Sequence, residues 1–307
     1  MPQSRFSTFA LGTEPLTYVP LDDARRLYDA FRAAGQTTFD TAHCYTYWNR
    51  RVGSAERRLG ELVSGAESSR DDVFVITKGG HIPVPGQYDV PDRYLSPDLL
   101  TRQLAESLDR LNLPHIDLYL LHRDDPRVPA AEHLAAVQPF LAAGMVRRIG
   151  VSNWTPDRIT AANAFAAENN YTPFTACEAF HNLAHIPPEH HDPLYPFTTP
   201  DHLDWYRQTQ FPMLAFSSGA WGYFTDKPRH KVPEVDNPTS RARRARAESL
   251  AQTLHATPHQ IALAYLLASP FPCTPIFATN KESELHENLA ATRIHLTPDQ
   301  RRFLVEG

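Results

Sequence analysis

The sequence predicts an α/β protein with a (β/α)8 barrel, the TIM-barrel architecture, from two observations. Strand-like and helix-like patterns alternate along its 307 residues until eight units have passed. Consecutive apolar strand segments also end in polar side chains, as expected where parallel strands converge on one rim of a barrel. A hydrophobic content of 42% in a chain of this length is compatible with one barrel or with two smaller domains. The fold prediction therefore depends on the alternation.

The first five units are visible by residue 170. Each strand candidate is a short apolar run rich in β-branched or aromatic residues, and a segment of helical periodicity follows it. The strand segments are FSTFALGT, TTFDT, DVFVITK, IDLYLLH and RRIGVSN. The helices after them are expected at 21–34, 54–63, 97–111, 129–143 and 156–168.

Three more strand segments complete the count of eight: TACEAF, PMLAFSS and CTPIFAT. Helices are expected at about 201–209, at 241–268 with a break near Pro258, and at 281–291. Two proline-rich segments, HIPVPGQYDVPDRY and HIPPEHHDPLYPFTTP, follow the third and sixth strands. Loops in these positions form the catalytic face of a (β/α)8 barrel, so we expect them to shape a substrate pocket. The alternative is that they are rigid surface loops.

Composition narrows the class of partner. A formal net charge of −5 provides no basic surface for nucleic acid, so we expect a small-molecule substrate. The cysteines are widely spaced, which disfavours a disulfide framework or a zinc knuckle and favours a reducing cytoplasm. No run approaches the roughly 18 apolar residues of a membrane span, and the N-terminus lacks the pattern of a signal peptide. We therefore expect an unprocessed cytoplasmic protein.

Four residues form a candidate catalytic group. Asp40 and Tyr45 lie in FDTAHCY, Lys78 ends the third strand, and His122 ends the fourth. A phenol with a pKa of about 10 keeps its proton at neutral pH, and a nearby Lys78 ammonium would favour the phenolate and lower that pKa. Asp40 can keep Lys78 charged and aligned, while His122 can hydrogen-bond a substrate oxygen. Each residue alone has an ordinary structural explanation, but together they indicate a proton-donating site.

In several segments, taken in order, the chain resembles the aldo-keto reductase family. FDTAHCY is similar to that family's D-T-A-x-x-Y, and VGSAERRLGELV is similar to its G-x-S-E-x-x-L-G segment, with Ala55 between Ser54 and Glu56. ITKGG, LYLLHRDDP, RRIGVSN and HENLAA resemble further family segments, and the resemblance extends from ALGT to about Thr292. It implies one barrel domain over residues 1–307.

The resemblance also implies a function. It indicates a nicotinamide-dependent oxidoreductase that uses NADPH or NADH to reduce an aldehyde or ketone, or that runs the reverse oxidation. Tyr45 would be the general acid, Lys78 and Asp40 would tune it, and His122 would orient the carbonyl. Ser152 and Asn153 would hold the nicotinamide carboxamide.

Other cofactor contacts carried over from the family include one departure. The family usually has a glutamine on the sixth strand, where this chain has Glu178, so either this carboxyl is protonated or the amide is held differently. Phe216 would stack on the nicotinamide. The segment expected to cover the pyrophosphate consists of Ser217, Ser218, Gly219 and Trp221. The alternative is an ordinary turn rich in small residues.

The adenosine side leaves the coenzyme open. NADP-preferring family members place a lysine, a serine or threonine and an arginine here, and this chain has Ala278, Thr279 and Glu284. A carboxylate accepts a hydrogen bond from a ribose 2′-hydroxyl and repels a 2′-phosphate, which favours NADH. Asn280 and Lys281 could rebuild a phosphate contact. Glu287 and Asn288 of HENL complete the expected site.

Candidate substrate-pocket residues are mostly aromatic, which suits a flat or ring-shaped substrate: Tyr47, Trp48, Tyr88, His181 and Trp221. Sugars, aromatic aldehydes and polyketide-like ketones all fit this description, and the sequence does not indicate an oligomeric state.

Two other function classes stay open. A metal-dependent hydrolase would use His122, Asp124 and the histidines of HNLAHIPPEHH, namely His181, His185, His190 and His191. Because that segment has no helix on which two histidines would share a face, we expect no metal. Asp124 and Asp125 more readily cap a turn. A cofactor-binding regulatory subunit is the second class, for which the basic run 240–248 would be an interaction patch rather than a solvated helix face.

Overall fold

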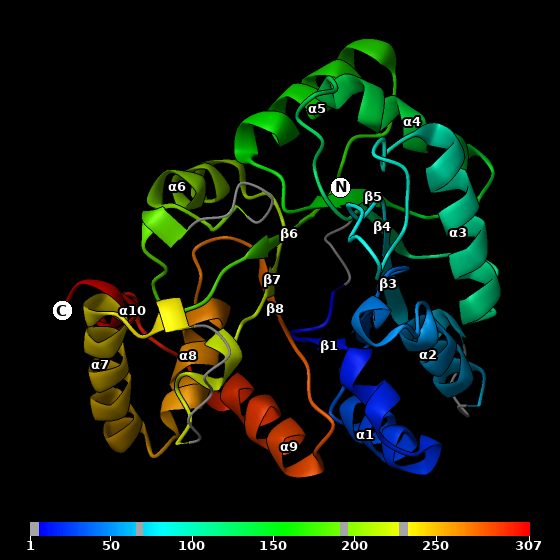
Figure 1. Cartoon of the computed structure of the whole chain (residues 1–307). Coiled ribbons are helices and arrows are strands. Elements are labelled where there is room, and N and C mark those ends of the chain that lie inside the picture. The colour runs from blue at the N-terminus through cyan, green and yellow to red at the C-terminus, as the bar shows by residue number, and fades with distance from the viewer. Residues whose placement is uncertain (1–5, 66–69, 191–195, 227–232) are drawn as a thin grey trace.

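Eight parallel strands form a closed barrel, in which each strand pairs with the next along the chain and β8 pairs with β1 (Figure 1). The computed structural model describes residues 6–65, 70–190, 196–226 and 233–307. The strands are β1 (Ala10–Gly12), β2 (Thr38–Asp40), β3 (Phe74–Gly79), β4 (Leu118–Leu121), β5 (Ile149–Ser152), β6 (Cys177–Phe180), β7 (Met213–Phe216) and β8 (Cys273–Phe277). The predicted (β/α)8 barrel is confirmed.

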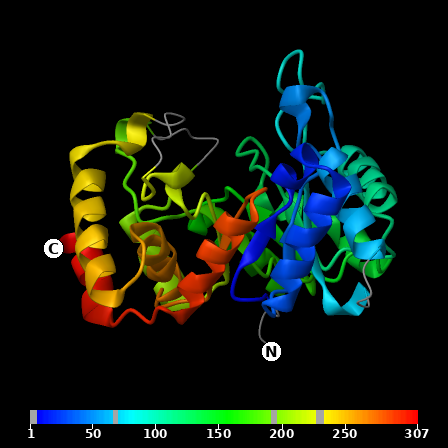
Figure 2. The same ribbon diagram turned by 90° about the horizontal axis from the view of Figure 1, so that it is seen from below.

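Helices cover the outside of the barrel (Figure 1; Figure 2). They are α1 (Leu21–Ala33), α2 (Ser54–Ser64), α3 (Pro97–Leu111), α4 (Ala130–Ala142), α5 (Pro156–Asn169), α6 (Pro200–Thr209), α7 (Pro238–Leu254), α8 (Pro258–Leu267), α9 (Glu282–Ala290) and α10 (Pro298–Glu306). The expected break near Pro258 is present, since His255 ends α7 with φ 52° and Thr257 caps α8. In the part of the chain that the structure describes, no helix is both long and apolar enough to cross a bilayer.

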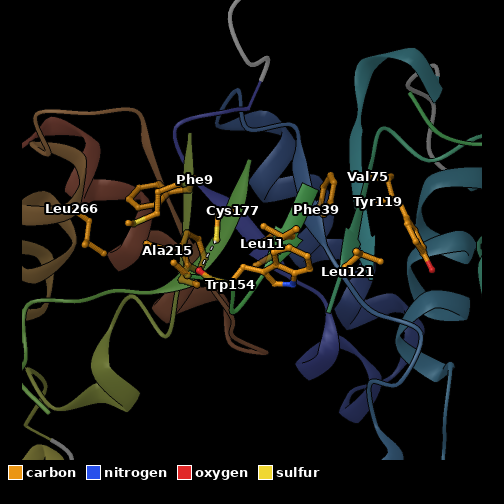
Figure 3. Close-up of a cluster of buried hydrophobic side chains, with 14 of the residues drawn as sticks. Phe9, Leu11, Phe39, Val75, Tyr119, Leu121, Trp154, Cys177, Ala215 and Leu266 are labelled. Carbon is orange, nitrogen blue, oxygen red and sulfur yellow. Dashed lines mark hydrogen bonds between the residues drawn. The ribbon is translucent and has the colours of Figure 1, made fainter. Parts of the chain in front are cut away.

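Alternation along the strands separates two apolar layers. Phe74 and Ile76 of β3 belong to a cluster shared by strands around the ring, which fills the inside of the barrel. Val75, between them, belongs to the larger cluster that joins the strands to the helices. Figure 3 shows part of this outer layer, including Phe39, Val75 and Tyr119.

The same alternation brings three charged side chains to the inner rim. Asp40 follows Thr38 by two residues, Lys78 follows Ile76, and Glu178 follows Ala176. Their relative exposures are 2%, 0% and 3%, so all three are buried inside the barrel. The barrel therefore holds a lysine and two carboxyl groups in a region that water barely reaches.

The basic run 240–248 lies on α7, where its arginines bind the chain itself. Arg243 donates to the carbonyl of Leu183 at 3.0 Å. Arg244 donates to the carbonyl of Tyr223 at 2.9 Å and pairs with Glu248 at 3.0 Å. These contacts explain the run as a helix face that ties neighbouring loops together.

Candidate active site

A cavity of about 880 Å³ lies over the carboxyl ends of the strands. Asp40, Tyr45 and His122 line it, and so do Glu284 and Asn288 of α9. The residues expected at the chemical centre and those expected around the adenosine therefore share one cavity.

Lys78 lies at the centre of the expected catalytic group. Its Nζ atom donates to Asp40 Oδ1 at 2.6 Å, to Tyr45 Oη at 3.1 Å and to the carbonyl of Thr41 at 3.0 Å. Tyr45 donates a long hydrogen bond of 3.5 Å to Asp40 Oδ2. Three of the four residues thus form one hydrogen-bonded unit, with Tyr45 facing the cavity.

Glu178 adds a second carboxyl group to this unit. Its Oε2 atom lies 3.1 Å from Lys78 Nζ, an ion-pair contact in which Oε2 accepts no hydrogen bond. Burial and the negative charge of Asp40 raise the pKa of Glu178 to about 8. Glu178 therefore favours its protonated form at neutral pH, which is one of the two possibilities that the sequence leaves open. We call Asp40, Tyr45, Lys78 and Glu178 the proton-transfer region.

The charges of this region decide the protonation of Lys78 and Tyr45. Burial alone would lower the pKa of Lys78, but Asp40 and Glu178 outweigh it and raise that pKa well above its usual range. Burial raises the pKa of Tyr45 well above 10 even though Lys78 opposes this, and the two carboxyl groups add to the rise. Lys78 thus favours the phenolate as expected, but the net direction is the reverse of our expectation because desolvation is larger.

His122 lies beside Tyr45, with ring centroids 5.9 Å apart. Its backbone N–H donates to the carbonyl of Gly79 at 2.7 Å, which fixes the end of β4 against β3. Burial, followed by the charges of His81 and Arg123, holds the pKa of His122 well below its usual range. The imidazole is therefore neutral at pH 7, so it can hydrogen-bond a substrate oxygen without carrying a charge.

Ser152 and Asn153 follow one another at the end of β5 and line the cavity. Asn153 Nδ2 donates to the carbonyl of His122 at 3.2 Å and to Ser152 Oγ at 2.9 Å. Its Oδ1 atom is buried and accepts no hydrogen bond. A buried amide oxygen without a donor is costly, so this atom is suited to accept a hydrogen bond from a bound ligand.

Phe216 and the turn after β7 also line the cavity. Phe216 packs edge-on against Phe180, with centroids 5.4 Å apart. The Ser218 hydroxyl donates to the carbonyl of Ile276 at 2.7 Å, so it ties the turn to β8. A Cβ at Gly219 would lie 2.7 Å from His259 Cε1, so a larger residue here would require the His259 ring to shift. Trp221, also in the turn, has φ 53°.

The start of α9 forms a second charged group, which we call the α9 region (Thr279, Lys281 and Glu284). Glu284 accepts from the Thr279 hydroxyl at 2.8 Å and from Lys281 Nζ at 3.0 Å. Glu284 lines the cavity, whereas Thr279 and Asn280 do not. Thr279 instead braces the loop, because its Oγ1 also accepts from the backbone N–H of Lys281 at 3.0 Å.

Two contacts join α8 and its N-cap to Glu287 and Asn288, the residues of α9 that we also expect at the adenosine side of the coenzyme site. Thr257 Oγ1 donates to Glu287 Oε1 at 2.8 Å, and His259 Nε2 lies 2.8 Å from Asn288 Oδ1. All four residues line the cavity.

Two of the expected substrate-pocket residues do not line the cavity, although Tyr47 and Trp48 do. Tyr88 is buried, and its hydroxyl lies 2.9 Å from His43 Nδ1 and accepts from Gln103 at 3.0 Å. His181 is buried against Tyr265 of α8, with centroids 6.0 Å apart. The expectation that these two side chains line the cavity is corrected: Tyr88 is held by polar contacts and His181 packs against an aromatic ring.

The two long loops likewise contribute less than expected. The loop after β3 supplies His81 to the cavity, and the described part of the loop after β6, 181–190 and 196–199, supplies no lining residue. The turn after β7 and the segment 44–48 line it instead.

The residues invoked for a hydrolase are separated. Asp124 is paired with Arg158 at 2.7 Å, and Asp125 caps a turn by accepting from the Arg127 backbone N–H at 3.2 Å. His191 lies outside the described residues. Among the described residues, Asp124 and the histidines at 181, 185 and 190 belong to no cluster suited to a metal.

Several lining residues escape the sequence reasoning: Cys44, His81, Arg123, Thr257 and His259. Cys44 and Arg123 are sequence neighbours of Tyr45 and His122, and His81 begins the proline-rich loop after β3. Their positions in the sequence could therefore have identified them as candidate lining residues. Thr257 precedes a proline and caps α8. His259 has no sequence signal that we recognise.

Comparison with known proteins gives the family. The Aldo/keto reductase family matches residues 6–305. Aldo-keto reductase str7 of Strobilurus tenacellus is 27% identical over 303 residues, which cover 92% of this chain and 80% of that protein. The 6-dehydroglucose reductase of Novosphingobium aromaticivorans is 36% identical over 147 residues, 48% of this chain and 46% of that protein.

A solved structure agrees on the fold. The crystal structure of a thermostable aldo-keto reductase in complex with the inhibitor epalrestat has a TM-score of 0.75 with this chain, covers 99% of it and 96% of that chain, and is 24% identical. The family match covers the barrel and the segments that carry the resemblance. This chain therefore belongs to the Aldo/keto reductase family of oxidoreductases.

Proposed function

We propose that this chain is a nicotinamide-dependent carbonyl reductase, which converts an aldehyde or ketone into an alcohol and runs the reverse oxidation with the same residues. The observation that carries the proposal is the Lys78 ammonium, 2.6 Å from Asp40 and 3.1 Å from the hydroxyl of Tyr45, beneath a cavity that Tyr45 lines. A proton donor, a cation to stabilise its anion and a carboxylate to hold that cation are thus in contact.

The reaction needs a hydride and a proton at opposite ends of the carbonyl. A reduced nicotinamide, when bound, supplies the hydride to the carbonyl carbon. Tyr45 donates its proton to the carbonyl oxygen, and Lys78 stabilises the phenolate that remains. His122, held neutral by burial, hydrogen-bonds the same oxygen and orients it. The raised pKa of Tyr45 keeps its proton available throughout the neutral range.

The residues present fit a nicotinamide. The unpartnered Oδ1 of Asn153 can accept from the NH2 of a carboxamide, and a protonated Glu178 can donate to its oxygen. Phe216 offers an aromatic surface at the end of β7. These groups match both the polar edge and the flat face of the ring.

The coenzyme is NADH or NADPH, and Glu284 favours NADH. Its carboxylate lines the cavity and would repel a 2′-phosphate, although Lys281 at 3.0 Å offsets part of that charge. The substrate is a carbonyl compound that fits beside Tyr47 and Trp48. An oxidised sugar belongs among the compounds tested, because one relative is a 6-dehydroglucose reductase.

The test is the loss of nicotinamide absorbance with each coenzyme over a panel of aldehydes, ketones and oxidised sugars. We expect Tyr45→Phe to lose at least about 100-fold in turnover, since general acid catalysis contributes about 10²–10⁴-fold. Tyr171→Phe, on the exposed surface, is the matched control. Unchanged turnover in Tyr45→Phe would overturn the assignment. Coenzyme binding without any turnover would favour the regulatory-subunit alternative.

A further inference from the structure

Cys44, His81 and His122 form a cluster beside the proton-transfer region. Cys44 Sγ lies 3.5 Å from His122 Nδ1, and the rings of His81 and His122 have centroids 4.9 Å apart. One ligand atom from each residue lies within 4.8 Å of the others. All three residues are buried, yet all three line the cavity.

One of the three separations already suits a tetrahedral metal ion, and the third ligand atom lies within 4.8 Å. Zinc–sulfur and zinc–nitrogen bonds of about 2.3 and 2.0 Å place the two ligand atoms about 3.5 Å apart. Cys44 Sγ and His122 Nδ1 have this separation without any movement. A hydrogen bond between the Cys44 thiol and the His122 imidazole is the alternative explanation of this 3.5 Å distance.

His81 has the orientation that a ligand needs. Its Nδ1 atom lies 2.8 Å from the carbonyl of Ile82, which assigns the ring proton to Nδ1 and leaves the lone pair on Nε2. A histidine that donates from one nitrogen to a carbonyl and binds metal with the other is the usual arrangement in metal sites. Arg123 Nη2 donates a long hydrogen bond of 3.5 Å to the same Nε2, so a metal ion must displace this contact, and the charge of Arg123 limits the affinity.

We propose that Cys44, His81 and His122 bind a thiophilic divalent cation such as Zn²⁺ within the cavity. One thiolate and two imidazoles favour Zn²⁺ or Co²⁺ over Mg²⁺ and Ca²⁺, which take oxygen ligands. Binding replaces the S–H bond of Cys44 with a sulfur–metal bond and releases the proton to solvent. The fourth position takes water or a substrate oxygen.

The consequence for activity rests on the proposed function. That reaction needs no metal, and a bound cation engages His122 and occupies space beside Tyr45. Zn²⁺ is therefore an inhibitor of carbonyl reduction by this chain, acting at the substrate part of the cavity.

Cobalt titration of the whole chain, without coenzyme or substrate, tests the site directly. We expect Co²⁺ to produce the thiolate-to-cobalt charge-transfer absorption and visible bands of a tetrahedral site. Cys44→Ser should abolish the charge-transfer band and His81→Gln should weaken Co²⁺ binding by at least about tenfold. Cys273→Ser, which alters a cysteine outside the cavity lining, should leave both unchanged.

Absence of the charge-transfer band, or its survival in Cys44→Ser, would overturn the metal site and leave a hydrogen bond only. Circular dichroism of each variant separates loss of binding from loss of folding. Inhibition gives the second measurement, since the Zn²⁺ concentration for half-inhibition should rise at least about tenfold in Cys44→Ser. Turnover without cobalt binding contradicts this inference alone, and cobalt binding without turnover contradicts the proposed function alone.

Discussion

The proton-transfer region and the α9 region each pair a lysine with a carboxylate at similar distances but in different surroundings. Lys78 lies 2.6 Å from Asp40, with side-chain exposures of 0% and 3%. Lys281 lies 3.0 Å from Glu284, with exposures of 56% and 24%. Coulomb interactions weaken as the local dielectric rises, so the first pair interacts far more strongly than the second.

This difference assigns different tasks to the two regions. Removing one charge from the proton-transfer region should shift the pKa values of the groups in contact with it, because little water is present to screen the change. Removing one from the α9 region changes a screened contact with a ligand. We therefore expect substitutions in the proton-transfer region to alter rate and pH dependence, and substitutions in the α9 region to alter coenzyme preference.

The largest effect is expected for Lys78→Met. The change leaves Asp40 buried without its cation, and breaking a buried ion pair costs about 3–5 kcal/mol. Turnover should also fall at least about 100-fold, because the phenolate of Tyr45 loses its stabilising charge. Urea unfolding and steady-state kinetics measure the two losses.

Lys281→Met is the matched control for the exposed pair, where a loss of at most about 1 kcal/mol is expected. Equal losses of stability in the two variants would contradict the contrast between the regions.

The next effect concerns stability against pH in Glu178→Gln. Burial and Asp40 raise the pKa of Glu178 from 4.5 to about 8, so the folded state holds this proton more tightly than the unfolded state. The resulting stability is complete below the unfolded pKa and is lost as the pH rises through the folded pKa. The melting temperature of the unaltered chain should therefore fall between about pH 5 and 8, and the Glu178→Gln variant should lose less over the same range. Parallel melting curves would show that Glu178 does not titrate there.

Strand alternation is enough to predict which rim residues face inward. Asp40 and Lys78 each follow an inward residue by two positions, and a period of two holds along any regular strand. The contact between Lys78 and Glu178 is not predictable in this way. It joins β3 to β6, which are not neighbours in the sheet, so only the closed ring brings the two side chains together.

The direction of a loop side chain cannot be predicted in this way, because loops lack the regular alternation of a strand. Tyr88 contacts His43 and Gln103, and His181 packs against Tyr265, although the sequence predicts both in the substrate pocket. The helix α10 could have been found, since Thr297 and Gln300 form a capping box around a proline at its start.

A smaller effect is expected for Glu284→Arg. Replacing the carboxylate with a guanidinium removes a repulsion and adds a bidentate partner for a 2′-phosphate. The ratio of NADPH to NADH affinity should rise about tenfold or more, since 1.4 kcal/mol is tenfold and one charged hydrogen bond contributes about 1.5–3 kcal/mol. Coenzyme titration followed by protein fluorescence measures the ratio. Glu282→Arg, two residues earlier on α9 and outside the cavity lining, should leave the ratio unchanged. The same shift in both variants would show that net charge alone causes it.

The smallest expected effect is the salt dependence that separates the two regions. Raising the ionic strength from about 0.01 to 1 M shortens the Debye length from about 30 to 3 Å, which screens exposed charges and leaves buried ones largely unaffected. The effect of Glu284→Arg on the coenzyme ratio should therefore shrink at high salt. The difference between Glu178→Gln and the unaltered chain in melting temperature against pH should persist, because Glu178 is 3% exposed. An equal reduction of both differences by salt would contradict this contrast. It would mean that solvent ions screen the charges around Lys78 as effectively as those of the α9 region.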